Sequence, residues 1–367
     1  MCRGVNRLEI EELDEPQPRA GEVKLRMVAT GVCRTDLSVL QGHLRFPLPI
    51  VLGHEGAGVV AELGPGVEEL AVGDPVICTI VPSCGRCHAC LHGESALCAE
   101  TTVGSGRMLD GTTRLSKRGE PIHSLAYQGA FAECAVVPER AAVKVRGDAP
   151  LAQVCGLACG VSTGLGAALF RAEVEAGSSV VVLGAGGVGL SVLMGARLRG
   201  AAPLIAADIA PAKLAKAREL GLATHTIDVS RAPLAEAVRA LTGGRGADYG
   251  FDAVGAPGTL EPVVEAIRAG GVAVVIGHAA GAVEARLDTT RFLRQKWVTG
   301  TFGGSIHAKR HIPEFVELYL AGRLDLDALM DRVYTLDELP QAFADLEAGR
   351  ITRGAVRFGA LERRGRG

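Results

Sequence analysis

The stretch VVVLGAGGVGL, residues 180–190, joins a β-branched run to glycines in G-x-G-x-x-G spacing at Gly184, Gly186 and Gly189. A strand that ends in this pattern and leads into a helix is typical of a dinucleotide-binding turn. The first glycine permits the tight turn, the second lets the backbone approach a pyrophosphate, and the third lets helix and strand pack closely. The helix N-terminus then directs unpaired N–H groups at the phosphates. The stretch therefore predicts an α/β domain that binds a dinucleotide.

The next strand indicates which dinucleotide is bound. Asp208 stands at its end, 19 residues after Gly189. A carboxylate there accepts hydrogen bonds from a ribose diol and repels a 2′-phosphate, so we expect NAD rather than NADP. Lys213 is a second candidate for a ribose contact, although a surface lysine on a helix is the simpler interpretation.

The distribution of residue types along the chain predicts two domains. From about residue 161 to 304, apolar strands alternate with alanine-rich helical stretches, which indicates a doubly wound parallel sheet covered on both faces. Residues 1–160 are rich in Val, Gly and Pro with short apolar runs, and predict a β-rich domain. Residues 305–367 hold one helix and a last strand, so we expect them to return to the first domain. Their basic end, 361–367, is expected to be solvated.

Composition argues against several classes of protein. The 367 residues are 48% hydrophobic with a net charge of -2, which gives no reason to expect nucleic acid or an anionic membrane as partner. Neither an apolar run of about 18 residues nor a signal-like h-region occurs, so we expect a cytoplasmic protein without a membrane partner. Its ten cysteines are then expected to be thiols or metal ligands, because the cytosol is reducing.

Four of the cysteines form a cluster within CGRCHACLHGESALC, residues 84–98. The spacing C-x2-C-x2-C-x7-C brings thiolates together in tight turns and predicts a structural zinc site in a lobe at about 82–100. An iron–sulfur cluster is the alternative, which fits less well beside a nicotinamide domain that needs no electron relay. His88 and His92 are surplus to four thiolates and are expected at the surface. The predicted ligands are Cys84, Cys87, Cys90 and Cys98.

Three further segments offer metal ligands. Cys33 lies in TGVCRTDLSVLQG (30–42), His54 and Glu55 lie in VLGHEGAGVV (51–60), and Cys159 lies in VCGLACGVSTG (154–164). A catalytic zinc takes three protein ligands and leaves one position open, and two cysteines with one histidine are a known set. Taken singly, each residue is equally well explained as a buried thiol or a hydrogen-bonded histidine.

GHEGAGVVAELGPGV, residues 53–67, fits the signature G-H-E-x2-G-x5-G-x2-V of the zinc-containing alcohol dehydrogenases in the medium-chain dehydrogenase/reductase superfamily. The chain resembles this family over nearly its whole length, because GVCRTD, DGTTRL, GAFAE, CGVSTGLGAA, GAGGVG and TGTFGG follow in the family's order. The resemblance implies a GroES-like catalytic domain at 1–160 and 305–367 and an NAD-binding Rossmann domain at 161–304.

The resemblance also implies roles for individual residues. Cys33, His54 and Cys159 would hold a catalytic zinc, which with the lobe makes two zinc ions per chain. Glu55 would lie close enough to approach the metal, Asp36 would orient His54, and Thr35 would bind the alcohol and take its proton. The expected cofactor contacts are Arg34 and Arg353 on the pyrophosphate, together with Thr163, Gly184, Gly186, Gly187, Val188, Gly189, Asp208 and Lys213.

Ser38 departs from the family pattern. In the animal and plant enzymes of this group, a histidine three positions after the Thr/Ser passes the proton on to solvent. Serine has no pKa near 7, so we expect the relay here to be truncated or to run through water. His43 is the alternative relay.

The expected activity is reversible oxidation of an alcohol to an aldehyde or ketone, with hydride transfer to NAD. The segment at 101–128 resembles an insertion of the dimeric animal and plant classes, which favours a homodimer over a homotetramer. Two enzyme alternatives remain: a formaldehyde dehydrogenase acting on a thiol adduct, and a dehydrogenase whose tightly bound nicotinamide needs an external electron acceptor. The formaldehyde dehydrogenases carry an arginine at the position where Thr102 stands in this chain. Arg107 lies close to that position. A non-catalytic nucleotide-binding module is least supported, because Thr35 and all three ligands are retained.

Overall fold

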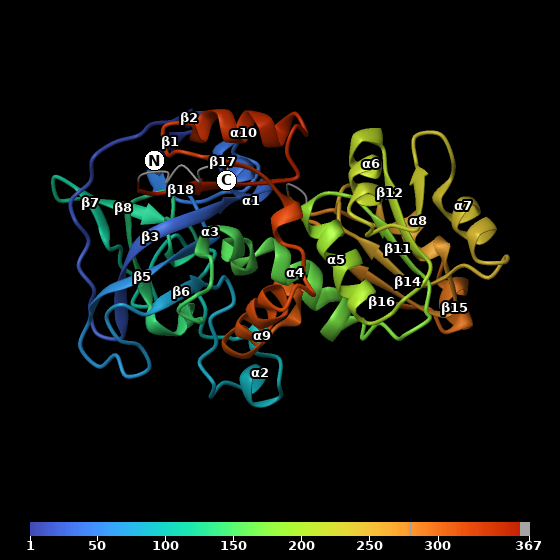
Figure 1. Ribbon diagram of the computed structural model, residues 1–367, viewed down its shortest axis with the longest axis horizontal. Helices are drawn as coiled ribbons and strands as arrows, with labels where there is room; N and C mark the ends of the chain where they lie inside the picture. The colour runs from blue at the N-terminus through green and yellow to red at the C-terminus, as the bar shows by residue number, and fades with distance from the viewer. Residues whose placement is uncertain (279–280, 360–367) are drawn as a thin grey trace, which may run out of the picture. The chain divides into compact units, whose positions relative to one another are not determined.

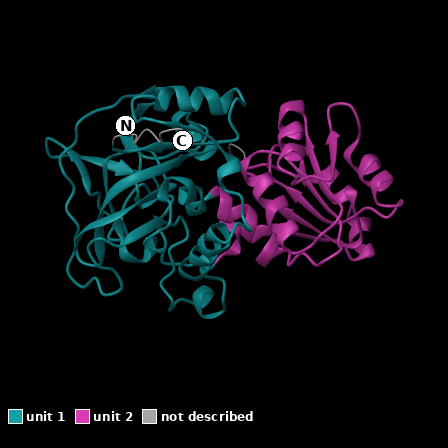
Figure 2. Cartoon of the chain, viewed as in Figure 1, with its two compact units in different colours: residues 1–159, 307–367 teal, residues 160–306 magenta. Residues whose placement is uncertain are grey.

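The computed structural model describes residues 1–278 and 281–359, so the expectation for 361–367 lies outside the described residues. The chain divides into two compact units, one of residues 1–159 and 307–367 and the other of residues 160–306 (Figure 2). They are called the first and second unit below.

The second unit is built on one six-stranded sheet with every neighbouring pair parallel (Figure 1). Its order β13-β12-β11-β14-β15-β16 is that of the doubly wound dinucleotide fold. This confirms the α/β prediction. The strands are β11 Val180–Leu183, β12 Leu204–Asp208, β13 His225–Asp228, β14 Ala247–Asp252, β15 Ile267–Val275 and β16 Trp297–Gly300. The helices are α4 Gly160–Gly166, α5 Gly187–Leu198, α6 Pro211–Glu219, α7 Leu234–Leu241 and α8 Leu260–Ala266, with a π-turn at Ala167–Arg171 and 3-10 turns at Thr289–Arg294 and Gly303–Ser305.

The centre of that sheet is apolar because both of its faces are covered. Val180, Val181 and Val182 of β11 are fully buried, as expected of a strand between two helical layers. Helix α5, which follows β11, is also apolar and mostly buried, but it has only 12 residues. Among the described residues, no single helix is long and apolar enough to cross a membrane.

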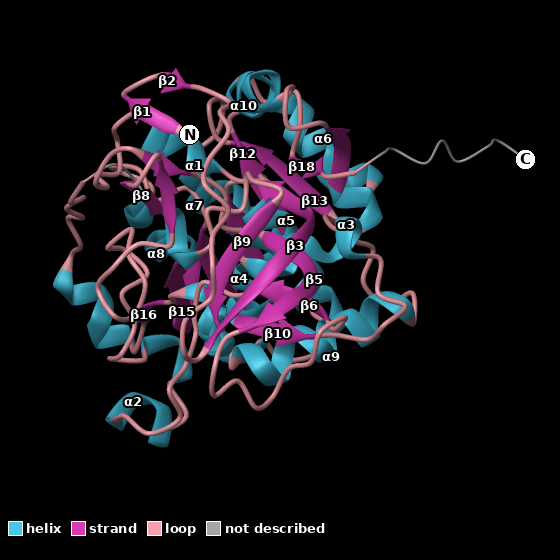
Figure 3. Cartoon of the chain, turned by 90° about the vertical axis from the view of Figure 1, so that its left-hand side faces the viewer, coloured by secondary structure: helices cyan, strands magenta, loops and turns pink. Residues whose placement is uncertain are grey.

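The first unit contains a seven-stranded sheet and a five-stranded sheet, both of mixed direction. The larger has the order β10-β6-β5-β3-β18-β17, with β9 also on β3, and Figure 3 shows β9, β3, β5 and β6 side by side. Its strands are β3 Glu22–Val32, β5 Gly56–Leu63, β6 Pro75–Cys78, β9 Cys134–Pro138, β10 Ala142–Lys144, β17 Met330–Tyr334 and β18 Arg353–Arg357. The smaller sheet, in the order β2-β1-β4-β8-β7, holds β1 Cys2–Gly4, β2 Arg7–Leu8, β4 Ile50–Val51, β7 Leu115–Lys117 and β8 Glu120–Ser124.

Helices and short 3-10 turns fill in around these sheets. The α-helices are α1 Arg34–Leu40, α2 His88–Leu91, α3 Leu151–Val154, α9 Ala308–Leu320 and α10 Leu339–Glu347. The 3-10 turns are Ser95–Leu97, Leu125–Tyr127, Glu139–Ala141, Cys155–Ala158 and Asp327–Leu329.

Strand β3 organises the larger sheet. Its side chains Val23, Leu25 and Met27 enter one buried cluster and Val32 enters a second, so the strand is covered almost throughout. The far end of the chain returns to β3, because β18 pairs with it antiparallel from Gly354 to Arg357. This pairing joins β18, and β17 beside it, to the larger sheet of the first unit.

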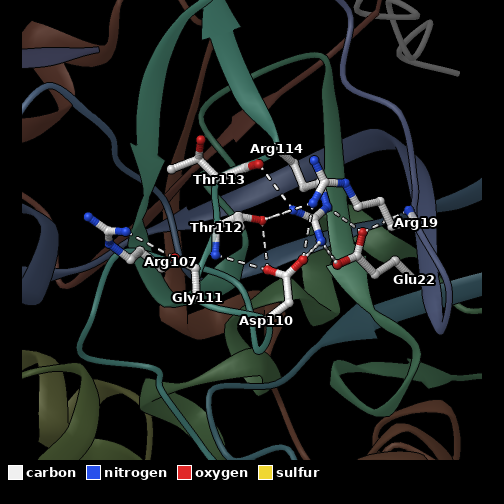
Figure 4. Close-up of polar contacts among 8 residues, drawn as sticks. All are labelled: Arg19, Glu22, Arg107, Asp110, Gly111, Thr112, Thr113 and Arg114. Carbon is white, nitrogen blue, oxygen red and sulfur yellow. Dashed lines mark hydrogen bonds and ion pairs between the residues drawn. The ribbon is translucent and has the colours of Figure 1, made fainter.

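The insertion at 101–128 is attached to the start of β3 by a group of charged side chains (Figure 4). Arg114 donates two hydrogen bonds of 2.6 Å to the carboxylate of Glu22 and one of 2.7 Å to Asp110. The side chains of Arg114 and Glu22 are only 5% and 8% exposed. Paired buried charges of this kind fix the loop to the sheet.

Candidate active site and metal centres

Three separate segments of the first unit bring together Cys33, His54, Glu55 and Cys159. Cys33 lies between β3 and α1, the His54–Glu55 pair lies just before β5, and Cys159 follows the turn Cys155–Ala158. One ligand atom from each of the four lies within 4.8 Å of the others. Ligands of a single tetrahedral zinc lie roughly 3.3–3.8 Å apart, given bonds of about 2.0–2.3 Å. The arrangement therefore has the dimensions of a metal centre.

Asp36 supports the histidine from behind. Its Oδ1 accepts a hydrogen bond of 2.7 Å from Gly53 N, and its Oδ2 lies 3.1 Å from His54 Nδ1. Because Nδ1 faces Asp36, Nε2 is the nitrogen of His54 that is left to face a metal ion. On the other side, a Cβ on Gly31 would stand 1.9 Å from Glu55 Oε2, so only glycine leaves room for that carboxylate.

The charges at this cluster favour a cation. Asp36 and Glu55 are both 0% exposed, and Arg353 is the fixed positive group that pairs with Glu55. Burial raises the pKa of Asp36 and of Glu55 above their usual values. Burial alone would lower the pKa of His54, but the neighbouring charges of Asp36 and Cys33 leave it well raised. The Cys159 thiol hydrogen-bonds to Cys33, which lowers the pKa of Cys33 and raises that of Cys159.

This donor set fits zinc. Two sulfur atoms and one imidazole nitrogen match a three-ligand catalytic site, with Asp36 supplying the usual carboxylate behind the histidine. A divalent cation would also offset the buried negative charge, because the thiols bind metal as thiolates. Cys155, which is not part of the cluster, has its pKa raised to about 12 by burial.

Helix α1 carries the other predicted residues of this region. Thr35 and Ser38 are half-buried and stand three positions apart, so they share one face of the helix. Arg34, next to Cys33, is exposed. His43 is also exposed, and its backbone N–H donates to the carbonyl of Ser38.

Arg353 lies at the start of β18, buried, with its guanidinium on Glu55. The expected contact with a pyrophosphate involves a ligand outside the structure and stays a prediction. The observed partner shows a second function of the side chain, since it neutralises a carboxylate beside the metal cluster.

The four cysteines of the lobe also converge. Sγ of Cys84 is 4.0 Å from Sγ of Cys90, and Sγ of Cys87 is 4.0 Å from Sγ of Cys98. Backbone N–H groups donate to two of these sulfurs at 3.3 Å. The N–H of Cys90 lowers the pKa of Cys87 to about 6. Four thiols at these separations fit a closed tetrahedral zinc site. His88 and His92 are exposed and stack on each other at 4.0 Å.

The glycine fingerprint has the predicted geometry in the second unit. Gly184 has φ +98°, and a Cβ on Gly189 would stand 1.8 Å from Gly184 O, so both positions require glycine. A Cβ on Gly186 would have no described atom within 4 Å, which leaves open space at the middle glycine. No described side chain caps the N-terminus of α5, where Gly187 and Val188 lie half-buried. The open space and the uncapped N–H groups fit a pyrophosphate.

Asp208 ends β12 beside this turn. Its Oδ2 accepts a hydrogen bond of 2.8 Å from Ala185 N, within the fingerprint, and its Oδ1 accepts one of 2.9 Å from Ala210 N. Each oxygen keeps a lone pair for a further donor. Lys213 Nζ lies 3.8 Å from Oδ2, on the same side. Thr163 lies half-buried in α4.

One residue near the metal cluster was missed from the sequence. Gln128 is 1% exposed, and its side-chain oxygen accepts a hydrogen bond of 3.0 Å from Gly56 N, immediately after Glu55. The only signal was a lone amide in the otherwise mostly apolar stretch LAYQGAF.

The chain is similar to known proteins over nearly its whole length. Residues 19–147 match the alcohol dehydrogenase GroES-like domain, and residues 187–321 match the zinc-binding dehydrogenase domain. An alcohol dehydrogenase zinc-binding domain protein from Burkholderia ambifaria is 39% identical, with 94% of this chain and 93% of that chain covered and a TM-score of 0.89. Benzyl alcohol dehydrogenase from Acinetobacter calcoaceticus is 36% identical, with 96% of both chains covered and a TM-score of 0.90. A zinc-binding dehydrogenase from Sinorhizobium meliloti, solved with NADP, is 26% identical, covers 97% of this chain and 98% of that chain, and has a TM-score of 0.80.

Proposed function

Since the chain belongs to the zinc-containing alcohol dehydrogenase family of the medium-chain dehydrogenase/reductase superfamily, we propose that it oxidises an alcohol to an aldehyde or ketone with NAD, using one catalytic and one structural zinc. The observation that carries the proposal is the convergence of Cys33, His54 and Cys159 within 4.8 Å.

In this proposal the chain's own residues hold and orient the reacting groups. Cys33, His54 and Cys159 hold the catalytic ion, and Asp36 keeps the His54 ring turned toward it. When bound, zinc supplies Lewis-acid polarisation of the alcohol oxygen, and NAD accepts the hydride. Thr35 binds the alcohol hydroxyl and accepts its proton. Ser38, on the same face of α1, stands at the relay position, and because a serine hydroxyl does not titrate near neutral pH, the relay beyond Thr35 is truncated or runs through water.

The choice of NAD rests on Asp208. Its carboxylate stands where the ribose diol of a dinucleotide is expected, and its charge would repel a 2′-phosphate. The Sinorhizobium meliloti relative was solved with NADP, so membership of the family does not by itself select NAD. The predicted contacts of Arg34, Thr163, Lys213 and Arg353 are part of the same proposal.

A small alcohol with an aromatic or apolar group is the substrate class to test first, because a relative at 36% identity is a benzyl alcohol dehydrogenase. The thiol-adduct alternative gains no support from Arg107, whose guanidinium donates to its own turn at Gly111 O, 3.0 Å away. We also propose a homodimer. Edge strand β16 of the second unit presents Trp297, which is 69% exposed, and Leu293 nearby is 84% exposed. Exposed apolar residues at a sheet edge favour pairing with a second chain.

Two measurements test the proposal. Elemental analysis is expected to find two zinc ions per chain, falling to one in Cys33→Ala or Cys159→Ala, and a single zinc in the unmutated protein would overturn it. A screen of NAD reduction over primary, secondary and aromatic alcohols is expected to find turnover without additives. Turnover only with a thiol cofactor, or only with an artificial electron acceptor, would select one of the alternatives instead.

A further inference from the structure

The turn that carries His54 and Glu55 is held from both sides. At the start of the turn, the side chain of Asp36 accepts a hydrogen bond from the N–H of Gly53. At its end, the side chain of Gln128 accepts a hydrogen bond from the N–H of Gly56. The second of these N–H groups belongs to the peptide plane that joins Glu55 to Gly56. A hydrogen bond that fixes this plane therefore fixes the backbone from which Glu55, and His54 before it, are directed at the metal cluster.

The amide of Gln128 has only one of its two polar ends satisfied. Its Nε2 is buried and has no hydrogen-bond partner in the described part of the chain. An unsatisfied buried donor destabilises a fold, and an apolar side chain of the same shape would avoid it. The contact that explains a glutamine at this position is therefore the hydrogen bond that its side-chain oxygen accepts from Gly56 N. A side chain at position 56 would be crowded, because a Cβ there would stand 2.7 Å from Met27 Cε and 3.0 Å from Ala130 Cβ.

Gln128 is placed by a turn with unfavourable backbone angles. Ala126 and Tyr127 have φ of 51° and 65°, in the left-handed region that side chains other than glycine rarely adopt. The Tyr127 hydroxyl links this turn, at the end of the insertion, to the start of the insertion through Thr101 Oγ1, at 2.8 Å, and Thr102 N. Just beyond it, Ala130 N donates to Gly53 O at 2.9 Å. Such strain persists where surrounding contacts hold it, often at functional sites.

We propose that Gln128 is a positioning residue: its side-chain oxygen holds the Glu55–Gly56 peptide and thereby sets how His54 and Glu55 face the catalytic metal. This inference rests on the proposed function. It assigns a task to the strained turn, which ends the insertion at 101–128 and contacts the turn of His54 and Glu55 through one buried amide.

The test compares two near-isosteric variants of the whole chain. Gln128→Met keeps the approximate shape and removes the acceptor, whereas Gln128→Glu keeps both the shape and an acceptor oxygen. Gln17→Met is the matched control, because Gln17 is exposed. Each protein is loaded with zinc for chelator-driven metal release, and with cobalt(II) at the catalytic site for its visible spectrum.

Gln128→Met is expected to release the catalytic metal about tenfold faster and to shift the cobalt bands, with lobe metal and the KM for NAD unchanged. Gln128→Glu is expected to stay within about twofold of the unmutated enzyme. Metal release and cobalt bands in Gln128→Met equal to those of Gln17→Met would overturn the inference while leaving the proposed function intact. An unmutated protein with one zinc would instead overturn the proposed function. If Gln128→Met does not fold, Gln128→Asn, which withdraws the oxygen by one methylene, is held to the same two outcomes.

Discussion

Replacing Arg114 by methionine is expected to detach the insertion from β3. The substitution keeps an unbranched side chain and removes the guanidinium that joins Glu22 and Asp110 (Figure 4). The pair with Glu22 is buried, at 5% and 8% exposure. Breaking such a pair by removing one partner typically costs about 3–5 kcal/mol.

The lower end of that range applies here. In the variant, Glu22 still accepts the hydrogen bond of 2.9 Å from the backbone N–H of Arg19. The side chain of Asp110 is 42% exposed, so water can solvate its carboxylate. We therefore expect a loss of about 3 kcal/mol, which corresponds to roughly 150-fold in the equilibrium for local opening.

Hydrogen–deuterium exchange measured by peptide mass spectrometry is the suitable assay. The single tryptophan, Trp297, lies in the second unit, so its fluorescence does not report on this contact. Peptides covering 105–124 are expected to exchange about 150-fold faster in Arg114→Met under conditions where exchange reports the opening equilibrium. Peptides covering β11 and β12 of the second unit serve as the internal reference.

Two companion variants decide whether the ion pair is the cause. Arg107→Met removes an exposed guanidinium of the same loop that donates to Gly111 O, and it should change exchange little. Glu22→Met combined with Arg114→Met should recover most of the loss, because no buried charge is left unpaired. A double variant as unstable as Arg114→Met, or acceleration below about fivefold in Arg114→Met, would refute the reasoning.

Four further predictions follow from other features. Ser38→His should raise alcohol turnover or shift its pH profile where deprotonation limits, and an unchanged profile from pH 6 to 9 with hydride transfer limiting would contradict this. Asp208→Asn should lower the preference for NAD over NADP in kcat/KM by about 10-fold or more, because the like-charge repulsion is lost; an unchanged ratio would exclude that cause. The hydrogen bonds of Tyr334 and Arg350 lower the pKa of Asp345 to about 2, so its ionised form stabilises the fold above about pH 5 and loses this effect as the pH falls toward 2. The stability gap between the unmutated protein and Asp345→Asn, followed by thermal melting, should narrow over that window rather than stay constant. Trp297→Glu should shift the protein from dimer to monomer in light scattering, and a persistent dimer would exclude β16 as its interface.

Much of the fold followed from local patterns in the sequence. The run at 180–190 predicted a strand, a turn and a helix because each of its glycines answers a backbone requirement, and the structure shows those requirements at Gly184 and Gly189. The spacing of the lobe cysteines predicted one metal site, whereas Cys33, His54 and Cys159 were assigned to a second site only through the resemblance to the family.

Contacts between distant residues could not be predicted in this way. Arg114 and Glu22 are 92 positions apart, and Arg353 and Glu55 are 298 apart. Such pairs depend on strand register and on which side chains are buried together, and neither is written in a local pattern. For the same reason, the bond between Gln128 and Gly56, 72 positions apart, was found only in three dimensions.

The order in which the chain is synthesised has a consequence for the pairing of Arg353 with Glu55. All four members of the metal cluster have left the ribosome once residue 159 has emerged, but Arg353 follows 194 residues later (353 − 159). The ion pair that neutralises Glu55 in the folded chain therefore forms only after the whole second unit has been synthesised.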